Sequence, residues 1–442
     1  MLFVVIFPLV LIIAVYIILK LIVFMPAISG ENAIVSLETV EIGGIDQKML
    51  IRGEDTANPI LLYLHSGPGS TEMVSFRTYH RELEKHFTVV LWEQRGTGKS
   101  YDPSIPNTSM TIDTMVSDTG EVIQYLLNKF NQKKLFVAGH SWGSLLGILT
   151  VQKYPEYIYA YVGCGQEVNP VEGEEISYQY ALDAANARND AQAVKELEGI
   201  NSSYAYLDVE SNSDWYDDLM AERKWLDKYG GETYKQGNSF LILPSLLPSE
   251  YTLGDFIRFG QGVKFSLKAL WPQIMQVNLI ESANSLSVPV FFLQGRHDFN
   301  TPSSLVEDYF NALQAPQKEF IWFENSAHHP MYEEAEKYDQ VLINKLLPLA
   351  QITPTSTEYS YADLKAVQND IDDYFESFDE EGARNDKICQ VTNRVSIVDG
   401  YVEVNLKEIT DDIIKLFKER VSDSDAIKFK QGPPGHEDSD QK

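Results

Sequence analysis

Short apolar runs alternate with stretches of helical periodicity along most of the chain. The runs are rich in β-branched and aromatic residues, and they are continuous rather than alternating, which is typical of strands covered by helices on both faces. This pattern predicts an α/β fold with a mostly parallel central sheet. The six runs are Ile60–Leu64, Thr88–Trp92, Leu135–Ala138, Tyr159–Val162, Val288–Leu293 and Phe320–Phe323.

The strand pattern stops between Gly163 and Ser287, where helical pieces such as Ile176–Arg188 and Trp215–Lys228 take its place. A stretch of this length is too long for a plain loop in a compact domain. We therefore expect an inserted helical cap. The predicted boundaries are 167–287 for the cap, and 29–166 together with 288–350 for the core.

The first 25 residues form an apolar run in which Lys20 is the first charged residue. The run is long enough to span a bilayer and has no polar face, so we predict a transmembrane anchor over residues 1–28. A cleaved signal peptide is the alternative, because residues 27–29 suit a cleavage site, but the start lacks the basic residue typical of such peptides. Basic residues follow the span and none precedes it, which by charge favours a cytoplasmic body. A single N-terminal span is nevertheless typical of exported anchored enzymes, and we expect a single-pass membrane protein with an extracytoplasmic catalytic domain.

A second shift in composition, near residue 352, marks a linker, and a small α+β module is predicted over residues 355–430. Apolar residues at helical spacing come first. Two β-rich runs, Val395–Val398 and Tyr401–Leu406, then flank an Asp-Gly pair, which is a strong hairpin signal. Thr410 can cap a following helix, and the polar residues 431–442 are expected to be a disordered tail. The module contains no chemical motif.

The charge balance excludes several classes of partner. The 442 residues include 36 Lys and Arg against 64 Asp and Glu, which gives a formal net charge of −28. Binding to nucleic acid or to an anionic membrane surface depends on Lys and Arg, so neither is expected. The two cysteines lie far apart and match neither a disulfide framework nor a zinc-ligand pattern, and we expect no metal or other cofactor.

One motif carries the main chemical signal. Gly139-His140-Ser141-Trp142-Gly143 directly follows a predicted strand and precedes a helical run. A serine on a sharp strand-to-helix turn needs small neighbours, and its hydroxyl then stands at the carboxyl edge of the sheet. The amino end of the next helix favours negative charge at that point. An ordinary glycine-rich turn is the alternative, but the position between strand and helix favours Ser141 as a nucleophile.

A nucleophilic serine needs a base, and the base needs a carboxylate that orients it. Asp298 follows the predicted strand Val288–Leu293, and His328 follows the predicted strand Phe320–Phe323. Both therefore fall on loops at strand ends, where ligands gather in open α/β sheets. The order Ser, Asp, His is that of the α/β-hydrolase triad. We choose His328 as the base and expect His329 to be a packing or solvated residue.

The reaction intermediate also needs backbone donors for its oxyanion. A His-Ser-Gly-Pro-Gly sequence follows the predicted strand Ile60–Leu64, where such enzymes supply one N–H, and Gly67 is our candidate for it. The residue after the nucleophile, Trp142, supplies the other. A plain Gly-Pro turn is the alternative for the first segment.

Together these segments resemble the prolyl aminopeptidase (proline iminopeptidase) branch of the α/β-hydrolase superfamily. The family's His-Gly-Gly-Pro-Gly is present as His-Ser-Gly-Pro-Gly from residue 65, and its Asp-Gln-Arg-Gly-x-Gly-x-Ser as residues 93–100 with Glu first. Its Gly-Gly-Ser-Trp-Gly-Ser is present as residues 139–144, with His140 in the second place. The similarity covers about residues 33–350. It implies an α/β-hydrolase fold and a serine hydrolase.

Members of this family remove an N-terminal residue, often proline, and hold the free amine with carboxylates of the cap. The resemblance makes Glu167, Glu172, Glu174 and Glu175 candidate substrate-binding residues, although an acidic helical face is usually just solvated. Residues 163–287 carry 19 acidic and 9 basic residues. We therefore expect an aminopeptidase or small-peptide hydrolase acting on a short peptide or another small molecule. A carboxylesterase or lactonase with the same triad, and a non-catalytic binding protein with the same fold, are the alternatives.

Overall fold

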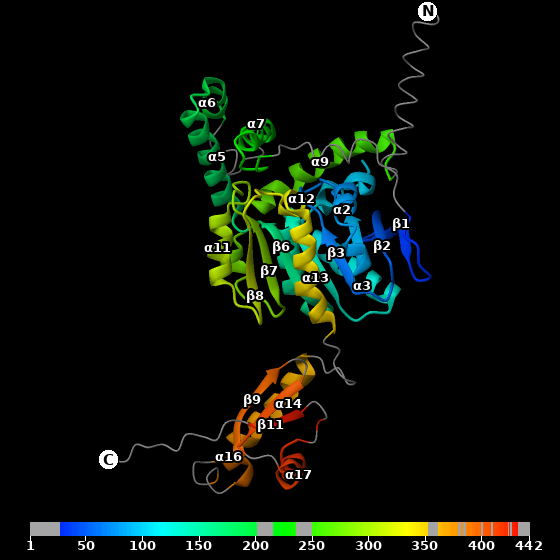
Figure 1. Ribbon diagram of the computed structural model, residues 1–442, viewed down its shortest axis with the longest axis vertical. Coiled ribbons are helices and arrows are strands. Elements are labelled where there is room, and N and C mark those ends of the chain that lie inside the picture. Colours follow the sequence, from blue (N-terminus) through cyan, green and yellow to red (C-terminus); the bar gives the residue numbers. More distant parts are fainter. Residues whose placement is uncertain are drawn as a thin grey trace, which may run out of the picture. The chain divides into compact units, whose positions relative to one another are not determined.

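The computed structural model describes residues 27–200, 215–235, 250–351 and, with short gaps, 361–431 (Figure 1). The chain divides into two compact units, Met1–Ala350 and Gln351–Lys442. The predicted anchor, up to residue 26, and the predicted tail from residue 432 lie outside the described residues. Within the described ranges, no helix combines the length and the apolar character needed to cross a membrane.

The first unit is built on an eight-stranded sheet with the order β1-β2-β4-β3-β5-β6-β7-β8. The strands from β4 to β8 in this order run parallel, as the continuous apolar runs predicted. From β3 to β7 nearly all side chains are buried on both faces because helices cover the sheet from both sides, whereas the edge strand β8 is mostly half-buried. The strands are β1 (Ile34–Ile42), β2 (Ile45–Gly53), β3 (Ile60–Leu64), β4 (Thr88–Glu93), β5 (Leu135–Ser141), β6 (Ile158–Gln166), β7 (Val290–Gly295) and β8 (Lys318–Phe323).

The sheet is mixed, because β1 and β2 form an antiparallel hairpin and β2 also pairs antiparallel with β4. The sequence interpretation did not identify these two strands. In β1 every second residue is exposed, as expected of an edge strand. A search for continuous apolar runs therefore passes over it, and the sheet is mostly parallel, as predicted, with an antiparallel edge that was not predicted.

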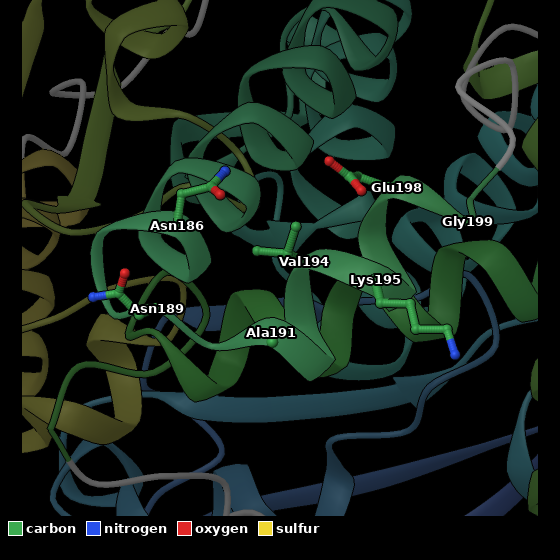
Figure 2. Close-up of a pocket in the computed structure, with 7 residues that line it drawn as sticks. All are labelled: Asn186, Asn189, Ala191, Val194, Lys195, Glu198 and Gly199. Atoms are coloured by element: carbon green, nitrogen blue, oxygen red, sulfur yellow. The ribbon is translucent and has the colours of Figure 1, made fainter.

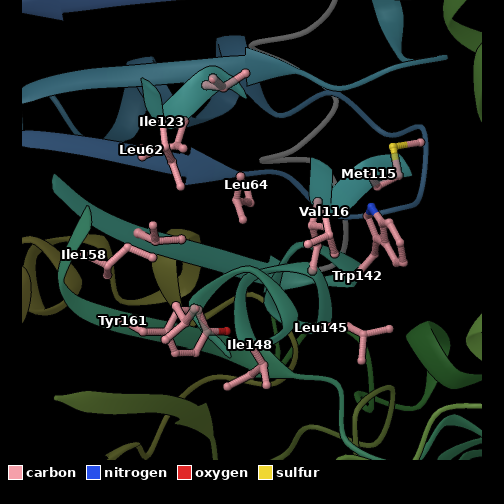
Figure 3. Packing of buried hydrophobic residues seen from close by; sticks show 14 of the residues in the cluster. Leu62, Leu64, Met115, Val116, Ile123, Trp142, Leu145, Ile148, Ile158 and Tyr161 are labelled. Carbon is pink, nitrogen blue, oxygen red and sulfur yellow. The ribbon is translucent and has the colours of Figure 1, made fainter. Parts of the chain in front are cut away.

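Two hydrophobic cores lie on the two faces of the sheet. Alternate residues of β3 point into different cores: Leu62 and Leu64 belong to one core, and Leu61 and Tyr63 belong to the other. Figure 3 shows part of the first core, where Leu62 lies near Ile123. Helices α3 (Ile112–Phe130), α4 (Trp142–Lys153), α10 (Leu279–Ser282) and α11 (Ser303–Ala312) pack on the first face, and α2 (Met73–Tyr79), α12 (Pro330–Glu333) and α13 (Ala335–Gln351) on the second.

Between β6 and β7 the described residues form helices, as predicted. The predicted helix over residues 215–228 has the same bounds as α7, whereas the one predicted from residue 176 begins earlier. These helices share a core of their own that includes Ala181, Leu219, Trp225 and Trp271. Figure 1 shows α5, α6 and α7 grouped at one end of the sheet. The helices are α5 (Pro170–Ala187), α6 (Ala191–Glu198), α7 (Trp215–Lys228) and α9 (Leu253–Ile274).

The second unit is an α+β module with its own small core. Its three-stranded sheet has the order β11-β10-β9, with β9 and β10 antiparallel as the hairpin signal predicted. The hydroxyl of Thr410 accepts from the N–H of Ile413 at 3.2 Å, which confirms the predicted helix cap. Its elements are α14 (Tyr361–Glu376), α16 (Lys387–Val391), β9 (Thr392–Val398), β10 (Tyr401–Leu406), α17 (Asp411–Arg420) and β11 (Ile427–Gln431).

Candidate active site

Ser141 stands at the sharp turn between β5 and α4. Its φ of 53° and ψ of −121° form a conformation that residues with a side chain rarely adopt. Close packing explains the two glycines beside it: a Cβ at Gly139 would lie 2.2 Å from the carbonyl oxygen of Gly143, and one at Gly143 would lie 2.1 Å from that of Leu64. The strand, strained serine and helix predicted from the sequence are therefore all present.

Asp298 and His328 lie on the turns that follow the neighbouring strands β7 and β8. Nδ1 of His328 is 3.0 Å from Oδ2 of Asp298, and both residues are buried. With a proton on Nδ1 shared with this carboxylate, Nε2 is left as the basic nitrogen. The turn of Ser141 is at the same carboxyl edge, because β5 is separated from β7 only by β6.

The Asp298 carboxylate is held by donors that the sequence interpretation did not identify. Backbone N–H groups of Asn300 and Thr301 each donate to Oδ1 at 2.9 Å. The Thr301 hydroxyl and the side-chain amide of Gln294 donate to Oδ2 at 2.8 and 2.9 Å. These contacts stabilise the ionised carboxylate and fix its orientation toward His328. No motif marks Gln294 or Thr301, since both act only through Asp298.

His328 is packed from two sides by backbone. A Cβ at Gly165, which has φ of +51°, would lie 3.0 Å from both Nδ1 and Cε1 of the His328 ring. The His328 N–H donates to the carbonyl oxygen of Glu232 at 3.0 Å. The neighbouring His329 is also buried, and its Nε2 is 3.0 Å from Oε1 of Glu232. His329 is therefore a packed, hydrogen-bonded residue. Of the two histidines, His328 is the one that contacts Asp298.

The loop after β3 contains Gly67, the predicted oxyanion donor. Its Ser66 N–H donates to Oε2 of Glu72 at 2.9 Å, so the next amide, that of Gly67, is the candidate donor on this loop. The loop is tied to the nucleophile turn through Gln94, which accepts from the Trp142 indole at 2.8 Å and donates its backbone N–H to Nε2 of His65 at 3.2 Å. An oxyanion bound by Gly67 and Trp142 would meet donors held in place before the reaction.

The four predicted cap carboxylates do not gather at one place. Glu174 is buried and Glu167 is partly buried, whereas Glu172 and Glu175 are exposed on the outer face of α5. The N–H of Glu167 donates to Oγ of Ser144 at 2.9 Å, and that hydroxyl donates to the carbonyl oxygen of Ser141 at 2.6 Å. Glu167 is thus two hydrogen bonds from the nucleophile turn.

Further charged residues of the cap region lie near Glu167 and Glu174, and the sequence interpretation did not identify them. Arg223 of α7 donates to Glu174 and to Glu222. Burial and the neighbouring Glu174 raise the pKa of Glu167 to about 7. Burial also raises the pKa of Glu232, but the hydrogen bond from His329 and the nearby His328 outweigh it and hold that pKa well below its usual range. Only tertiary structure brings these residues together, since no spacing links them.

Among the described residues, Glu72, His140 and His329 each offer one potential metal-ligand atom within 4.8 Å of the others. Both ring nitrogens of His140 and both carboxylate oxygens of Glu72 already have hydrogen-bond partners in the protein. A hollow between α5 and α6, lined by residues such as Asn186, Asn189 and Lys195, contains none of the predicted site residues (Figure 2). The candidate chemistry is therefore concentrated at the carboxyl edge of the sheet.

Comparison with known proteins supports the resemblance seen in the motifs. Residues 59–335 match the model of the alpha/beta hydrolase fold, and residues 362–432 match that of a Pro-like C-terminal domain. The "Probable aminopeptidase YbaC" of Bacillus subtilis (strain 168) is 35% identical over 317 residues, which are 71% of this chain and 97% of the relative. The "Proline iminopeptidase" of Heyndrickxia coagulans is 23% identical over 289 residues, 64% of this chain and 88% of the relative. The crystal structure of a proline iminopeptidase from Mycobacterium smegmatis aligns at 16% identity and a TM-score of 0.46, over 72% of this chain and 98% of that one. The sequence, the strand–serine–helix turn and the family match agree that this chain belongs to the alpha/beta hydrolase fold family.

Proposed function

We propose that the protein is a serine aminopeptidase or small-peptide hydrolase of the proline iminopeptidase type, with Ser141 as nucleophile, His328 as base and Asp298 as the orienting carboxylate. In this mechanism Nε2 of His328 takes the Ser141 proton as the oxygen attacks the scissile carbonyl carbon. The same proton then passes to the leaving amine, and water releases the acyl group by the reverse sequence. Asp298 keeps the Nδ1 proton in place and stabilises the imidazolium that forms.

The oxyanion would receive two backbone hydrogen bonds in this mechanism, from Gly67 and Trp142. Trp142 is the first residue of α4, so its N–H is among those that lack an acceptor within the helix. The amino end of α4 adds a favourable dipole. Donors of this kind are worth roughly 3–4 kcal/mol each in the transition state.

The observation that carries the choice of substrate is the group of carboxylates near His328. Glu167, Glu174, Glu222 and Glu232 outnumber the guanidinium of Arg223 in this part of the described chain. A substrate with a free, protonated amine would neutralise part of this negative charge, whereas a neutral ester would not. The site therefore favours a peptide with a free N-terminus over an uncharged acyl ester.

Glu167 is our first choice for the amine-binding carboxylate. Its pKa of about 7 means that its charge is poorly stabilised in the substrate-free protein, chiefly because of burial and also because of Glu174. An ammonium group beside it would supply the missing partner and lower that pKa, so binding and ionisation would favour each other. The aminopeptidase and proline iminopeptidase names of the relatives agree with a substrate of this class.

Paired substrates test this proposal. Alanyl and prolyl arylamides with a free amine are compared with the same arylamides after N-acetylation, which removes the charge and keeps the scissile bond. We expect kcat/KM to fall at least tenfold on acetylation, about the 1.4 kcal/mol of one charge-assisted hydrogen bond. Ser141→Ala should abolish turnover of both substrates and labelling by a fluorophosphonate.

Two outcomes would reject parts of the proposal separately. Equal rates for free and acetylated arylamides, with faster turnover of short-chain aryl esters, would favour the carboxylesterase or lactonase. A folded wild-type protein that fluorophosphonate does not label would reject the serine-hydrolase mechanism itself.

A further inference from the structure

Glu72 is a buried carboxylate placed between the oxyanion loop and the nucleophile turn. Its Oε2 accepts from the Ser66 N–H and from the Tyr63 hydroxyl, both at 2.9 Å. Its Oε1 is 3.0 Å from Nδ1 of His140 and accepts from the Tyr332 hydroxyl at 3.4 Å. Burial raises the pKa of Glu72, but the charge and hydrogen bond of His140 and the Ser66 N–H outweigh it and lower the pKa to about 2. Glu72 is therefore ionised at neutral pH.

His140 connects this carboxylate to the loop of the base. Its Nε2 is 2.9 Å from the carbonyl oxygen of His328, and because a carbonyl oxygen only accepts, Nε2 must carry a proton. Its Nδ1 faces an ionised carboxylate oxygen of Glu72, which also only accepts, so Nδ1 must carry a proton as well. The ring is fully buried. The proton count thus makes Glu72 and His140 an internal ion pair.

We propose that Glu72 and His140 form a positioning pair that joins the oxyanion loop, through Ser66, to the loop of the catalytic base, through the carbonyl of His328. This inference rests on the proposed function, in which the Gly67 amide and the His328 ring act on the same reacting group. The amide that Glu72 holds directly precedes Gly67, and the carbonyl that His140 holds belongs to His328 itself. The pair sets the spacing of the two loops, and neither member touches the substrate.

The charge balance of the pair also affects His328, because the two rings have their centroids only 4.8 Å apart. With both members charged, the pair adds no net charge beside the base. Without His140, three hydroxyl and amide donors would still face the Glu72 carboxylate, and no positive charge would remain opposite it. Among the described residues, Asp298, His329, Glu167 and Glu232 are further titratable groups that contact His328 or interact with its charge, and Arg223 interacts with both glutamates.

The test measures how fast a fluorophosphonate labels Ser141 as a function of pH, in the full chain and three variants: Glu72→Gln, His140→Gln and the double variant. We expect each to label roughly tenfold to a hundredfold more slowly, because a displacement of about 1 Å has that effect on reacting groups. In His140→Gln the unpaired Glu72 charge should move the acid limb of the profile up by roughly one pH unit. The double variant should return that limb to its wild-type position while labelling stays slow, a reversal that lost packing alone would not produce.

Matched controls are Glu82→Gln and His86→Gln, which change a glutamate–histidine pair of side chains 42% and 36% exposed. Both should label like wild type. Labelling of His140→Gln within twofold of wild type, or an unmoved acid limb, would overturn the inference. The inference would also be overturned if wild type bound one equivalent of metal and His140→Gln did not, because a metal ion would then take the place of the proton between Glu72 and His140. If His140→Gln does not fold, the labelling rate of the double variant is used instead, and a rate within twofold of wild type would overturn the inference.

A wild-type protein that does not label would reject the proposed function, and the inference with it. Labelled wild type with normally reactive variants would reject the inference alone.

Discussion

Nδ1 of His328 lies 3.0 Å from Oδ2 of Asp298, although 30 residues separate them in the chain. The contact arises because β7 and β8 are parallel neighbours, so the turns that follow them meet at one edge of the sheet. The Thr301 hydroxyl also lies within 3.1 Å of both side chains. This relationship determines which nitrogen of His328 is available as a base, and the first prediction follows from it.

Replacing Asp298 with Asn should lower kcat by roughly 10³–10⁴-fold, because an amide can hold the wrong tautomer of His328. The fold should be retained, since Asn keeps the shape of the carboxylate. Steady-state kinetics on a free-amine arylamide would check this. Asp308→Asn, on the exposed side of α11, is the control and should behave like wild type. Full activity in Asp298→Asn would contradict the assignment.

The two adjacent histidines should behave differently. His328→Ala should lower turnover by roughly 10⁴-fold, since it removes the base. His329→Ala should keep turnover within about tenfold, but it should lower the free energy of unfolding by roughly 1–3 kcal/mol, because the partly buried Glu232 carboxylate loses a hydrogen bond. Kinetics and urea unfolding would separate the two effects. The opposite ranking would mean that His329 is the base.

Glu167 should affect stability and substrate binding in opposite directions. Its pKa is raised from 4.5 to about 7 in the folded protein. Between these pH values the Glu167 carboxyl is therefore protonated in the folded protein and ionised in the unfolded chain. The contribution of protonated Glu167 to the free energy of unfolding is therefore fully present below about pH 4.5 and is lost as the pH rises through 7. Glu167→Gln should be more stable than wild type by roughly 1–3 kcal/mol at pH 8 and equal to it at pH 4.

The same variant should lose activity toward free-amine substrates while reacting normally with acetylated ones. In wild type, kcat/KM for the free-amine substrate should rise through about pH 7 as Glu167 ionises. Glu172→Gln, which changes an exposed carboxylate near the start of α5, is the matched control for both measurements. If Glu167→Gln and Glu172→Gln behave alike, the amine site lies elsewhere in the cap region.

Gly165 should be intolerant of any side chain because it packs against the His328 ring. Gly165→Ala would place a Cβ 3.0 Å from Nδ1 and Cε1 of that ring. We expect fluorophosphonate labelling to slow by roughly a hundredfold or more, since the base would be displaced. Gly44→Ala is a matched control, because Gly44 also has a positive φ but has open space around its Cβ position. Its strain should affect stability and leave labelling unchanged.

The N-terminal run should anchor the protein in a membrane, as the apolar length of residues 1–28 predicts. We expect the full chain to require detergent for extraction and a chain without these residues to be soluble with the same turnover. The deletion ends before β1 begins at Ile34, so no described strand is lost. Full-length protein that stays in the soluble fraction without detergent would contradict the anchor.

Local features of the sequence determined much of the fold. Continuous apolar runs marked the parallel strands because helices bury both of their faces. A serine with a glycine two positions away on each side marked the tight turn, because no side chain fits at Gly139 or Gly143. The hairpin and the Thr410 cap of the second unit follow from equally local chemistry. Asp298 and His328 could be chosen because strand order brings strand-end loops together.

Tertiary structure alone decided the rest. Whether a glutamate points inward depends on how a helix is rotated against its neighbours, which separates Glu174 from Glu172 on the same helix. Long-range packing brings Glu232 to His329 and Glu72 to His140, across 97 and 68 residues of sequence. Such contacts have no spacing that a sequence pattern could reveal. The edge strand β1 was missed because the search was for continuous apolar runs, whereas the residues of β1 alternate between exposed and partly buried.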